Sequence, residues 1–163
     1  MSFKRKLLAA GFVSALFASS LASAAQTYVV GTGATYRPFE YESPTKELIG
    51  FDVDLMKEIA KAAGFEVEFI NTPFDGIFAA LNNGDRDIVM SGLTITPKRA
   101  EAVDFSKPYF LAHQLILTNK NLKISSLKDL EGKLIAVVNS SAGDIAASNQ
   151  FGKTSTNIRR FDN

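Results

Sequence analysis

Strand-like and helix-like segments alternate along the first part of this chain, and this alternation restricts the possible fold more than any other feature. The strand-like segments are short and rich in β-branched or aromatic residues, which is typical of strands in a sheet. The helix-like segments carry apolar residues at helical spacing, and the first one ends at Gly64, a natural C-cap. In chain order, the segments are a strand at 27–31, a helix at 52–63, a strand at 65–69, a helix at 74–81 and a strand at 87–90. This order predicts an α/β layer with a mainly parallel sheet.

Three loops follow the predicted strands, at 31–39, 72–75 and 91–99. In a parallel sheet the carboxyl ends of the strands meet at one edge, and ligands bind there. We therefore expect these three loops to form a ligand site.

The rest of the chain adds further segments of both kinds and then stops. Between the first strand and the first helix, 37–51 predicts a hairpin or a long loop, and the extended run at 110–118 predicts a strand that crosses to a second lobe. Beyond it the sequence predicts a short helix with a turn at 125–133, a buried strand at 134–138, a loop that enters a helix at 139–151 and a strand at 157–161. The second lobe begins a β-loop-α-β pattern but lacks the elements that would complete it. We therefore interpret the chain as a truncated product or fragment.

The first 24 residues have the pattern of a secretory signal peptide. Three basic residues at 4–6 precede a mostly apolar run at 7–21, which is followed by the small-residue site Ala22-Ser23-Ala24. A short membrane anchor is the alternative, but the apolar run is shorter than the roughly 20 residues that span a bilayer. We expect cleavage after Ala24 or Ala25 and a mature protein in the periplasm.

The composition argues against several classes of function. The chain has no cysteine, which excludes disulfides, thiol chemistry, Cys-ligated metals and a lipoprotein anchor. It has 18 basic residues, three of them in the signal, against 17 acidic residues, and this balance argues against a nucleic-acid-binding surface. A single histidine leaves little material for a zinc site or a Ser-His-Asp triad. We expect neither a metal nor a cofactor.

The stretch SGLTITPKR at 91–99 breaks a local rule of helix formation. Its Thr-Pro pair predicts a helix start, yet Lys98 and Arg99 follow in the first turn, where the helix dipole favours anions. Gly92 lets a ligand approach the backbone, and Ser91 and Thr94 supply hydroxyl groups. The Arg99 guanidinium is a planar fork that matches a carboxylate. Together these residues predict a carboxylate cradle, with an exposed, solvated arginine as the alternative.

Two aromatic residues in the predicted ligand-facing loops are candidates for contact with a small molecule. Tyr36 follows the first strand and Phe74 opens the second helix, and flat side chains at such positions can clamp a ligand. Packing in the core is an equal alternative for Phe74. We interpret three acidic residues of the first helix as a solvated face and expect no catalytic residue; they are Asp52, Asp54 and Glu58.

Four stretches of the sequence carry a family resemblance. They are YRPFEY, GFDVDLMKEIAKAAG, FDGIFAALNNGDRDIVMSGLTITPKRAEAVDFSKPY and SLKDLEGKLIAVVNSSAG. In these stretches the chain resembles the solute-binding proteins of polar amino-acid ABC transporters (solute-binding protein family 3), the group of the glutamine-, histidine- and lysine/arginine/ornithine-binding periplasmic proteins. The resemblance runs from Val29 to nearly the end of the chain.

The resemblance implies a type II periplasmic-binding-protein fold, in which two α/β lobes joined by hinge strands close on the ligand. It implies lobe 1 at 25–110, a hinge strand at 111–119 and the start of lobe 2 at 120–163. Lobe 1 would then be mostly present and lobe 2 incomplete.

The same resemblance implies how an amino-acid ligand would be held at both ends of its backbone. Arg99 would pair with the α-carboxylate, assisted by Thr94 and by a backbone N–H near Ser141 of the second lobe. Carbonyl and hydroxyl groups at Ser91 and Gly92 would receive the α-ammonium group.

The side chain of the ligand would lie between Tyr36 and Phe74, but the sequence departs from the family pattern nearby. Gly33 stands where several members carry an acidic residue, and the loop at 139–143 replaces a usual Gly-Thr pair. The second-lobe aspartate that pairs with the ammonium group in the family is expected beyond the last residue of this sequence.

The implied function is capture of a polar L-amino acid in the periplasm and delivery to the membrane permease of an ABC transporter. We expect a monomer without a nucleic-acid partner. The alternative is an enzyme on the same fold, a periplasmic cyclohexadienyl or arogenate dehydratase. An enzyme needs a proton donor or base in the cleft, and the predicted cleft offers only Tyr36, hydroxyl groups and Arg99, so we favour binding without catalysis.

Overall fold

The computed structural model describes residues 25–162. The predicted signal peptide lies outside this range, and so does the last residue, Asn163. In the range that is described, no helix is long and apolar enough to cross a membrane.

The first group of elements is built on a three-stranded parallel sheet. Its strands are β1 (Thr27–Thr32), β5 (Glu66–Asn71) and β6 (Ile88–Val89), and β1 lies in the centre, in the order β5-β1-β6. The register places Val30 of β1 opposite Phe69 on one side and Ile88 on the other. The parallel sheet predicted from the alternating segments is therefore confirmed.

Four helical elements accompany these strands. They are α1 (Phe51–Ala63), the 3-10 helix η1 (Phe74–Gly76), α2 (Ile77–Asn82) and α3 (Pro97–Ala100). α1 ends at Gly64 as predicted, because this glycine adopts φ 78° and its N–H donates to the carbonyl of Ala60. The second predicted helix is split between η1 and α2, and α3 is only one turn long.

The core of this group lies between the sheet and α1. Helical spacing turns Val53, Met56 and Ala60 of α1 inward, and all three are buried. Met56 packs with Val30 of β1 and with Met90, which follows β6. This core fixes the ends of β1 and β6, and the loops that follow these strands lead to the candidate site.

A small antiparallel sheet connects β1 to α1. Its strands are β2 (Thr35–Tyr36), β3 (Glu40–Glu42) and β4 (Leu48–Ile49). β3 and β4 form the predicted hairpin, with Tyr41 opposite Ile49. Gly50 then leads into α1 with φ 129°, and a Cβ atom at this position would lie 2.3 Å from the carbonyl oxygen of Phe39. Only glycine fits this junction.

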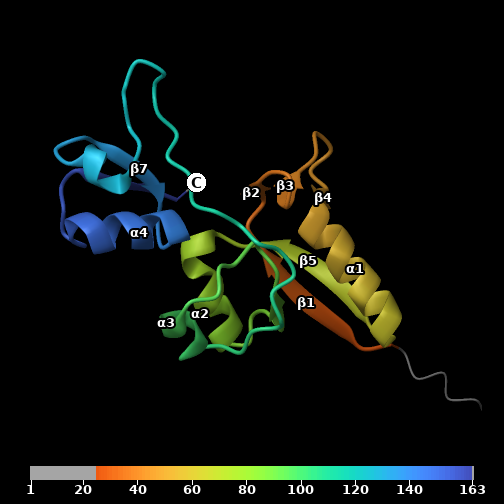
Figure 1. Ribbon diagram of the computed structural model, residues 1–163. Coiled ribbons are helices and arrows are strands. Elements are labelled where there is room, and N and C mark those ends of the chain that lie inside the picture. Colours follow the sequence, from red (N-terminus) through yellow and green to blue (C-terminus); the bar gives the residue numbers. More distant parts are fainter. Residues whose placement is uncertain (1–24, 163) are drawn as a thin grey trace, which may run out of the picture.

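The second group of elements consists of the 3-10 helix η2 (Leu127–Leu130), β7 (Ile135–Val138), α4 (Ala142–Phe151) and β8 (Ile158–Phe161). β7 and β8 pair in parallel, and each element lies in the segment where the sequence predicts it. Figure 1 shows this group (blue) apart from the sheet of β1 and β5, with the long segment that follows α3 (green to cyan) running between the two groups.

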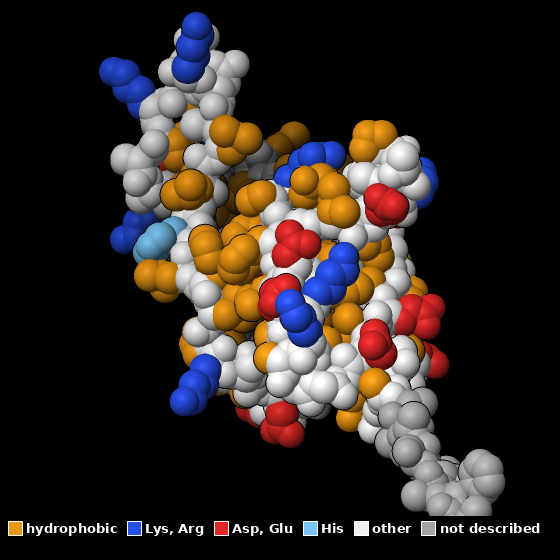
Figure 2. All heavy atoms as spheres, turned by 90° about the vertical axis from the view of Figure 1, so that its right-hand side faces the viewer, with side chains coloured by type: hydrophobic (Ala, Val, Ile, Leu, Met, Phe, Trp, Pro, Cys, Tyr) orange, Lys and Arg blue, Asp and Glu red, His pale blue; other side chains and the backbone are white. Residues whose placement is uncertain are grey.

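That connecting segment corrects one prediction. The run at 110–118 is extended but forms no strand, because no neighbouring strand pairs with it among the residues that the structure describes. Leu115 and Leu117 are 89% and 100% exposed. Only the start of the segment is packed, through ring contacts of Tyr109 with Phe51 and of Phe110 with Phe39. Figure 2 shows hydrophobic side chains (orange) gathered in the middle of one face, with scattered charges over and around them.

Candidate functional site

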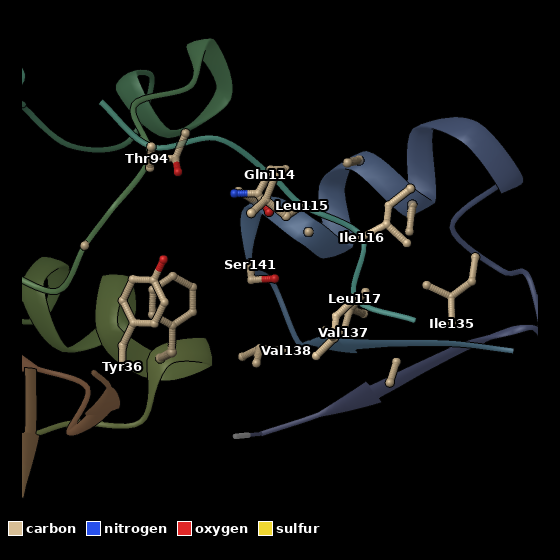
Figure 3. A pocket seen from close by; sticks show the side chains of 18 of the residues that line it. Tyr36, Thr94, Gln114, Leu115, Ile116, Leu117, Ile135, Val137, Val138 and Ser141 are labelled. Atoms are coloured by element: carbon tan, nitrogen blue, oxygen red, sulfur yellow. The ribbon is translucent and has the colours of Figure 1, made fainter. Parts of the chain in front are cut away.

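A cavity of about 750 Å³ lies between the two groups of elements, a size that suits a small molecule. The loops after β1, β5 and β6 contribute to its wall, as the topology predicts for a parallel sheet. Figure 3 shows Tyr36 and Thr94 on one side of the cavity, with Gln114 and Ser141 on the other. The cavity brings together all seven sequence-predicted site residues, which are Tyr36, Phe74, Ser91, Gly92, Thr94, Arg99 and Ser141.

Arg99 is the buried cation of this cavity. It is 9% exposed, and burial lowers the pKa of its guanidinium, which remains charged because the usual value is so high. One terminal nitrogen donates to the carbonyl oxygen of Thr94 at 2.7 Å, and the other donates to the carbonyl oxygen of Ser140 at 2.9 Å. The second bond spans the cavity, since Ser140 belongs to the second group of elements. Five N–H donors are available on a guanidinium, so donors remain for an anion in the cavity.

The unusual cation in the first helical turn now has a structural explanation. Thr96 is the predicted N-cap, and its hydroxyl accepts from the backbone N–H of Arg99 at 3.2 Å. α3 is only a single turn, so its dipole is small, and the guanidinium turns back to the Thr94 carbonyl. The turn places Arg99 in the cavity wall, and the interpretation as an exposed, solvated arginine is wrong.

The two candidate aromatic residues are placed differently. Tyr36 is 50% exposed and stacks on Phe39 with 5.3 Å between ring centroids. Phe74 is half-buried at the start of η1, and its ring lies 5.7 Å from the Arg99 guanidinium carbon. Phe78 contacts the same guanidinium at 5.4 Å. Phe74 thus serves both as a wall of the cavity and as a cation–π partner that supports Arg99.

Ser91 and Gly92 also line the cavity, and they follow β6 closely in the sequence. The Ser91 hydroxyl accepts from the backbone N–H of Gly33 at 2.9 Å and lies 2.9 Å from Oε1 of Glu40, to which it donates. Gly92 has φ 52°, and its N–H donates to Oδ2 of Asp52 at 2.7 Å. A Cβ atom on Gly92 would lie 3.0 Å from the ring of Tyr36, so glycine permits this close approach.

Two buried carboxyl groups behind Ser91 and Gly92 were missed by sequence reasoning. Asp52 is 0% exposed and Glu40 is 1% exposed. The interpretation of Asp52 as part of a solvated helix face is therefore wrong, whereas Asp54 and Glu58 are exposed as expected. Asp52 turns inward because Oδ2 accepts from the Gly92 N–H and from the Tyr109 hydroxyl at 2.9 Å.

The protonation of this pair follows from its surroundings. Burial raises the pKa of Glu40 from 4.5 to about 8, and the charge and the hydrogen bonding of the neighbouring Asp52 add to this shift. The hydrogen bond from the Ser91 hydroxyl partly opposes it. Burial and the nearby Asp52 charge likewise raise the pKa of Tyr109, which keeps its hydroxyl proton for Asp52. At neutral pH Glu40 is therefore mostly protonated.

The raised pKa of Glu40 predicts a stability that falls as pH rises. Between the unfolded pKa of 4.5 and the folded pKa of about 8, the folded protein binds more protons than the unfolded chain, so the free energy of unfolding decreases with pH. Because one pKa unit corresponds to about 1.4 kcal/mol, the decrease across this shift is on the order of 5 kcal/mol. Urea denaturation at a series of pH values measures this loss. In Glu40→Gln the same slope is expected to disappear, and an unchanged slope would assign it to other groups.

The second group contributes Ser141 at the start of α4. Its hydroxyl caps the helix by accepting from the N–H of Asp144 at 3.2 Å, and its own N–H donates to the carbonyl of Val138. The backbone N–H of Ser141 itself is thus already bonded, and Ala142 and Gly143 are the residues of this helix start that also line the cavity.

Asp144 holds this loop in place. It is 8% exposed, accepts from the Ser140 N–H at 3.1 Å, and pairs with Nε of Arg160 at 2.9 Å. Burial by itself raises the pKa of Asp144, but the bonds from Arg160, Ser148 and Ser140 outweigh it and lower the pKa below 3.8. Asp144 therefore fixes Ser140, whose carbonyl receives the bond from Arg99.

Replacing Asp144 by asparagine is expected to destabilise the protein by about 1–3 kcal/mol, because the nearly buried carboxylate loses its charge-assisted bonds to Arg160 and to the Ser140 N–H. The lowered pKa means that the stabilisation by Asp144 is present above pH 3.8 and is lost as pH falls further. Urea denaturation at pH 7 and at pH 3 measures both effects. The exposed Asp54→Asn is the matched control, and equal effects of the two changes would contradict the anchoring role.

No cluster of three or more His, Cys, Asp or Glu side chains that could hold a metal ion occurs within residues 25–162. The site consists of a buried arginine, hydroxyl groups, two aromatic rings and a buried carboxyl pair. Such a site can bind a small zwitterion by its carboxylate and its ammonium group.

Comparison with known proteins decides the family. Residues 28–158 match the model of the bacterial extracellular solute-binding proteins, family 3. The match covers most of the 163 residues of the sequence. The chain belongs to this family. The resemblance identified from the four sequence stretches is confirmed.

Relatives of this solute-binding protein are named for basic amino acids. A probable histidine-binding protein of Neisseria gonorrhoeae is 44% identical over 147 residues, which are 90% of this chain and 55% of the relative. The arginine-binding extracellular protein ArtP of Bacillus subtilis is 44% identical over 109 residues, which are 67% of this chain and 42% of the relative. The chain thus spans about half the length of the curated relatives it matches.

Solved structures confirm the fold class. The arginine-, lysine-, histidine-binding protein ArtJ from Geobacillus stearothermophilus matches with a TM-score of 0.80 and 41% identity, over 84% of this chain and 58% of that one. An ancestral amino acid-binding protein described as a precursor of cyclohexadienyl dehydratase matches with a TM-score of 0.77 and 45% identity, over 84% and 61%. This solute-binding protein therefore has the α/β architecture of the type II periplasmic binding proteins.

Proposed function

We propose that this solute-binding protein captures a polar L-amino acid in the periplasm and delivers it to the permease subunits of an ABC transporter. The observation that carries the proposal is Arg99, a buried cation in a cavity wall with N–H donors to spare. A buried guanidinium that bonds carbonyl groups and forms no salt bridge within residues 25–162 favours an anionic ligand. The protein acts as a monomer, after export by a signal peptide that is cleaved after Ala24 or Ala25.

In this proposal, Arg99 binds the α-carboxylate, and the Thr94 hydroxyl and the backbone at the start of α4 near Ser141 assist it. The Ser91 hydroxyl and the Gly92 carbonyl accept N–H bonds from the α-ammonium group. All of these residues line the same cavity. The proposed assignments divide the two charges of a zwitterion between two ends of the site.

Tyr36 and Phe74 hold the side chain of the ligand, since both rings line the cavity. Relatives named for histidine and arginine make these two amino acids the first ligands to test. Gly33 leaves no acidic side chain at one position of the wall, which favours a ligand whose side chain does not depend on an ion pair there.

The test is isothermal calorimetry of the purified protein against the twenty amino acids. We expect saturable binding of at least one polar amino acid, and absence of binding to all twenty would refute the proposal. Prephenate and arogenate serve as a second arm, because the ancestral precursor of cyclohexadienyl dehydratase is a structural relative. Turnover of either compound would favour the dehydratase, whereas no turnover together with amino-acid binding supports a protein that binds without catalysis.

A further inference from the structure

The buried Glu40–Asp52 pair has four carboxyl oxygens. Among the residues that the structure describes, two of these oxygens accept a hydrogen bond from an N–H or O–H group. Oε1 of Glu40 accepts from the Ser91 hydroxyl, and Oδ2 of Asp52 accepts from the Gly92 N–H and the Tyr109 hydroxyl. The other two oxygens, Oε2 of Glu40 and Oδ1 of Asp52, are buried without a partner. Buried polar atoms without partners are costly. Asp52 lies close enough to raise the pKa of Glu40, and a proton on Glu40 that faces Asp52 would satisfy both atoms.

The placement of that proton follows from the donors. Asp52 accepts two hydrogen bonds on one oxygen and lies in the first turn of α1, where the helix dipole favours a negative charge. Glu40 accepts only one hydrogen bond, from Ser91. The proton therefore belongs on Oε2 of Glu40, and Asp52 carries the charge.

The bond to Glu40 also decides what Ser91 can offer to a ligand. The Ser91 hydroxyl uses its proton toward Glu40 and one lone pair toward the N–H of Gly33. A serine hydroxyl has one proton and two lone pairs, so one acceptor site remains. Ser91 and Glu40 both line the cavity, and this acceptor suits a cationic N–H group rather than an anion.

We propose that the Glu40–Asp52 pair is the counter-charge for the ligand's ammonium group: it shares one proton in the ligand-free protein and releases that proton to solvent when an ammonium group binds beside Ser91. The proposal rests on the proposed function, because it requires a ligand that carries an ammonium group. Only the O–H bond of Glu40 breaks, and the buffer accepts the proton.

The charge balance of the cavity supports this coupling. Its charged lining residues are Glu40, Arg99 and Lys133, and the titratable groups that face the pair are Tyr109 from the connecting segment and the two carboxyls themselves. An opposite charge nearby favours the ionised form of a carboxyl. A bound ammonium group therefore lowers the pKa of Glu40, and ionised Glu40 in turn strengthens the hold of Ser91 on the ammonium group.

The first experiment observes the pair without a ligand. A carbon-13 NMR titration of the carboxyl groups is expected to show a glutamate that titrates near pH 8 and that is absent from Glu40→Gln. The amide in this variant keeps an acceptor for Ser91 and supplies an N–H to Asp52, so the fold should be retained. A wild-type protein in which every carboxyl titrates below about pH 6 would overturn the shared proton.

The second experiment counts protons on binding. Calorimetry at pH 7 in two buffers of unlike ionisation enthalpy is expected to show release of up to about one proton per arginine or histidine bound. The affinity of the wild-type protein should rise with pH by up to about tenfold per unit below pH 8. Glu40→Gln should bind without releasing a proton and without this pH dependence, whereas the exposed control Glu58→Gln should behave as the wild type. A deaminated analogue of the same ligand, which keeps the carboxylate, should release none.

The binding and NMR experiments test the ammonium counter-charge, the proposed function and the shared proton separately. Binding without proton release, or equal release in Glu40→Gln, would overturn the ammonium counter-charge and leave the proposed function intact. Absence of binding to any amino acid would remove the proposed function together with the ligand half of this proposal, while the NMR titration still decides the shared proton.

Discussion

Replacing Arg99 by alanine is expected to weaken binding of the preferred amino acid roughly a hundredfold. The change removes the buried cation that faces the proposed carboxylate position, and a charge-assisted bidentate pair contributes a few kcal/mol, which corresponds to about two orders of magnitude in Kd. Calorimetry with the ligand identified in the amino-acid screen measures the effect. Binding as tight as in the wild type would refute the carboxylate assignment.

Two controls separate binding from folding in this experiment. Arg99 also bonds the carbonyls of Thr94 and Ser140, so thermal unfolding of each variant must show that the fold is retained. Arg99→Lys keeps the charge without the planar fork, and an intermediate loss of about tenfold is expected for it. If both variants lose the same amount of affinity, the planar geometry of the guanidinium, and not its charge, accounts for the whole effect.

Replacing Gly50 by alanine is expected to produce the largest loss of stability, about 4 kcal/mol or more. Gly50 combines φ 129° with ψ 177°, a region that essentially only glycine adopts and that costs other residues about 1–3 kcal/mol. The added methyl carbon would also lie 2.3 Å from the carbonyl oxygen and 2.7 Å from the carbonyl carbon of Phe39. These are backbone atoms, so they cannot give way by a rotamer change.

A matched control for this change exists at the other end of α1. Gly64 also has a positive φ, 78°, but a Cβ atom there would meet nothing within 4 Å. Gly64→Ala is therefore expected to cost only about 1 kcal/mol, from backbone strain alone. The midpoint of urea denaturation compares the two variants, and equal shifts would show that the contact with Phe39 has no importance.

The elements of this fold were largely predictable because their signals are local. The helical spacing in α1 and the glycine that ends it lie within one stretch of sequence, and so do the Thr96-Pro97 start of α3 and the turn residues of the β3–β4 hairpin. The extended run at 110–118 shows the limit of such signals. A strand needs a partner with which to form hydrogen bonds, and the identity of the partner is not contained in the apolar pattern.

The candidate site was predictable in its outer parts and not in its interior. Arg99 was found because it breaks a rule at a helix start, and functional sites are where such violations are expected. Asp52 breaks no rule, since an acid in the first turn of a helix is ordinary. Its burial depends on Gly92 and Tyr109, which lie 40 and 57 residues away. Glu40 lies next to Phe39 in a predicted hairpin, and nothing else in the sequence indicated that this charged residue would be buried.

The hydrogen bond from Arg99 to Ser140 has a kinetic consequence. It joins the two groups of elements through a contact that the ligand does not make. Separation of the groups leaves a buried guanidinium short of one acceptor, which adds to the barrier for opening. For a ligand bound as proposed between the two groups, their separation would also break this contact, so its residence time would depend in part on a bond within the protein. Asp144, which holds Ser140 in place, would then affect that residence time through the protein's own bond.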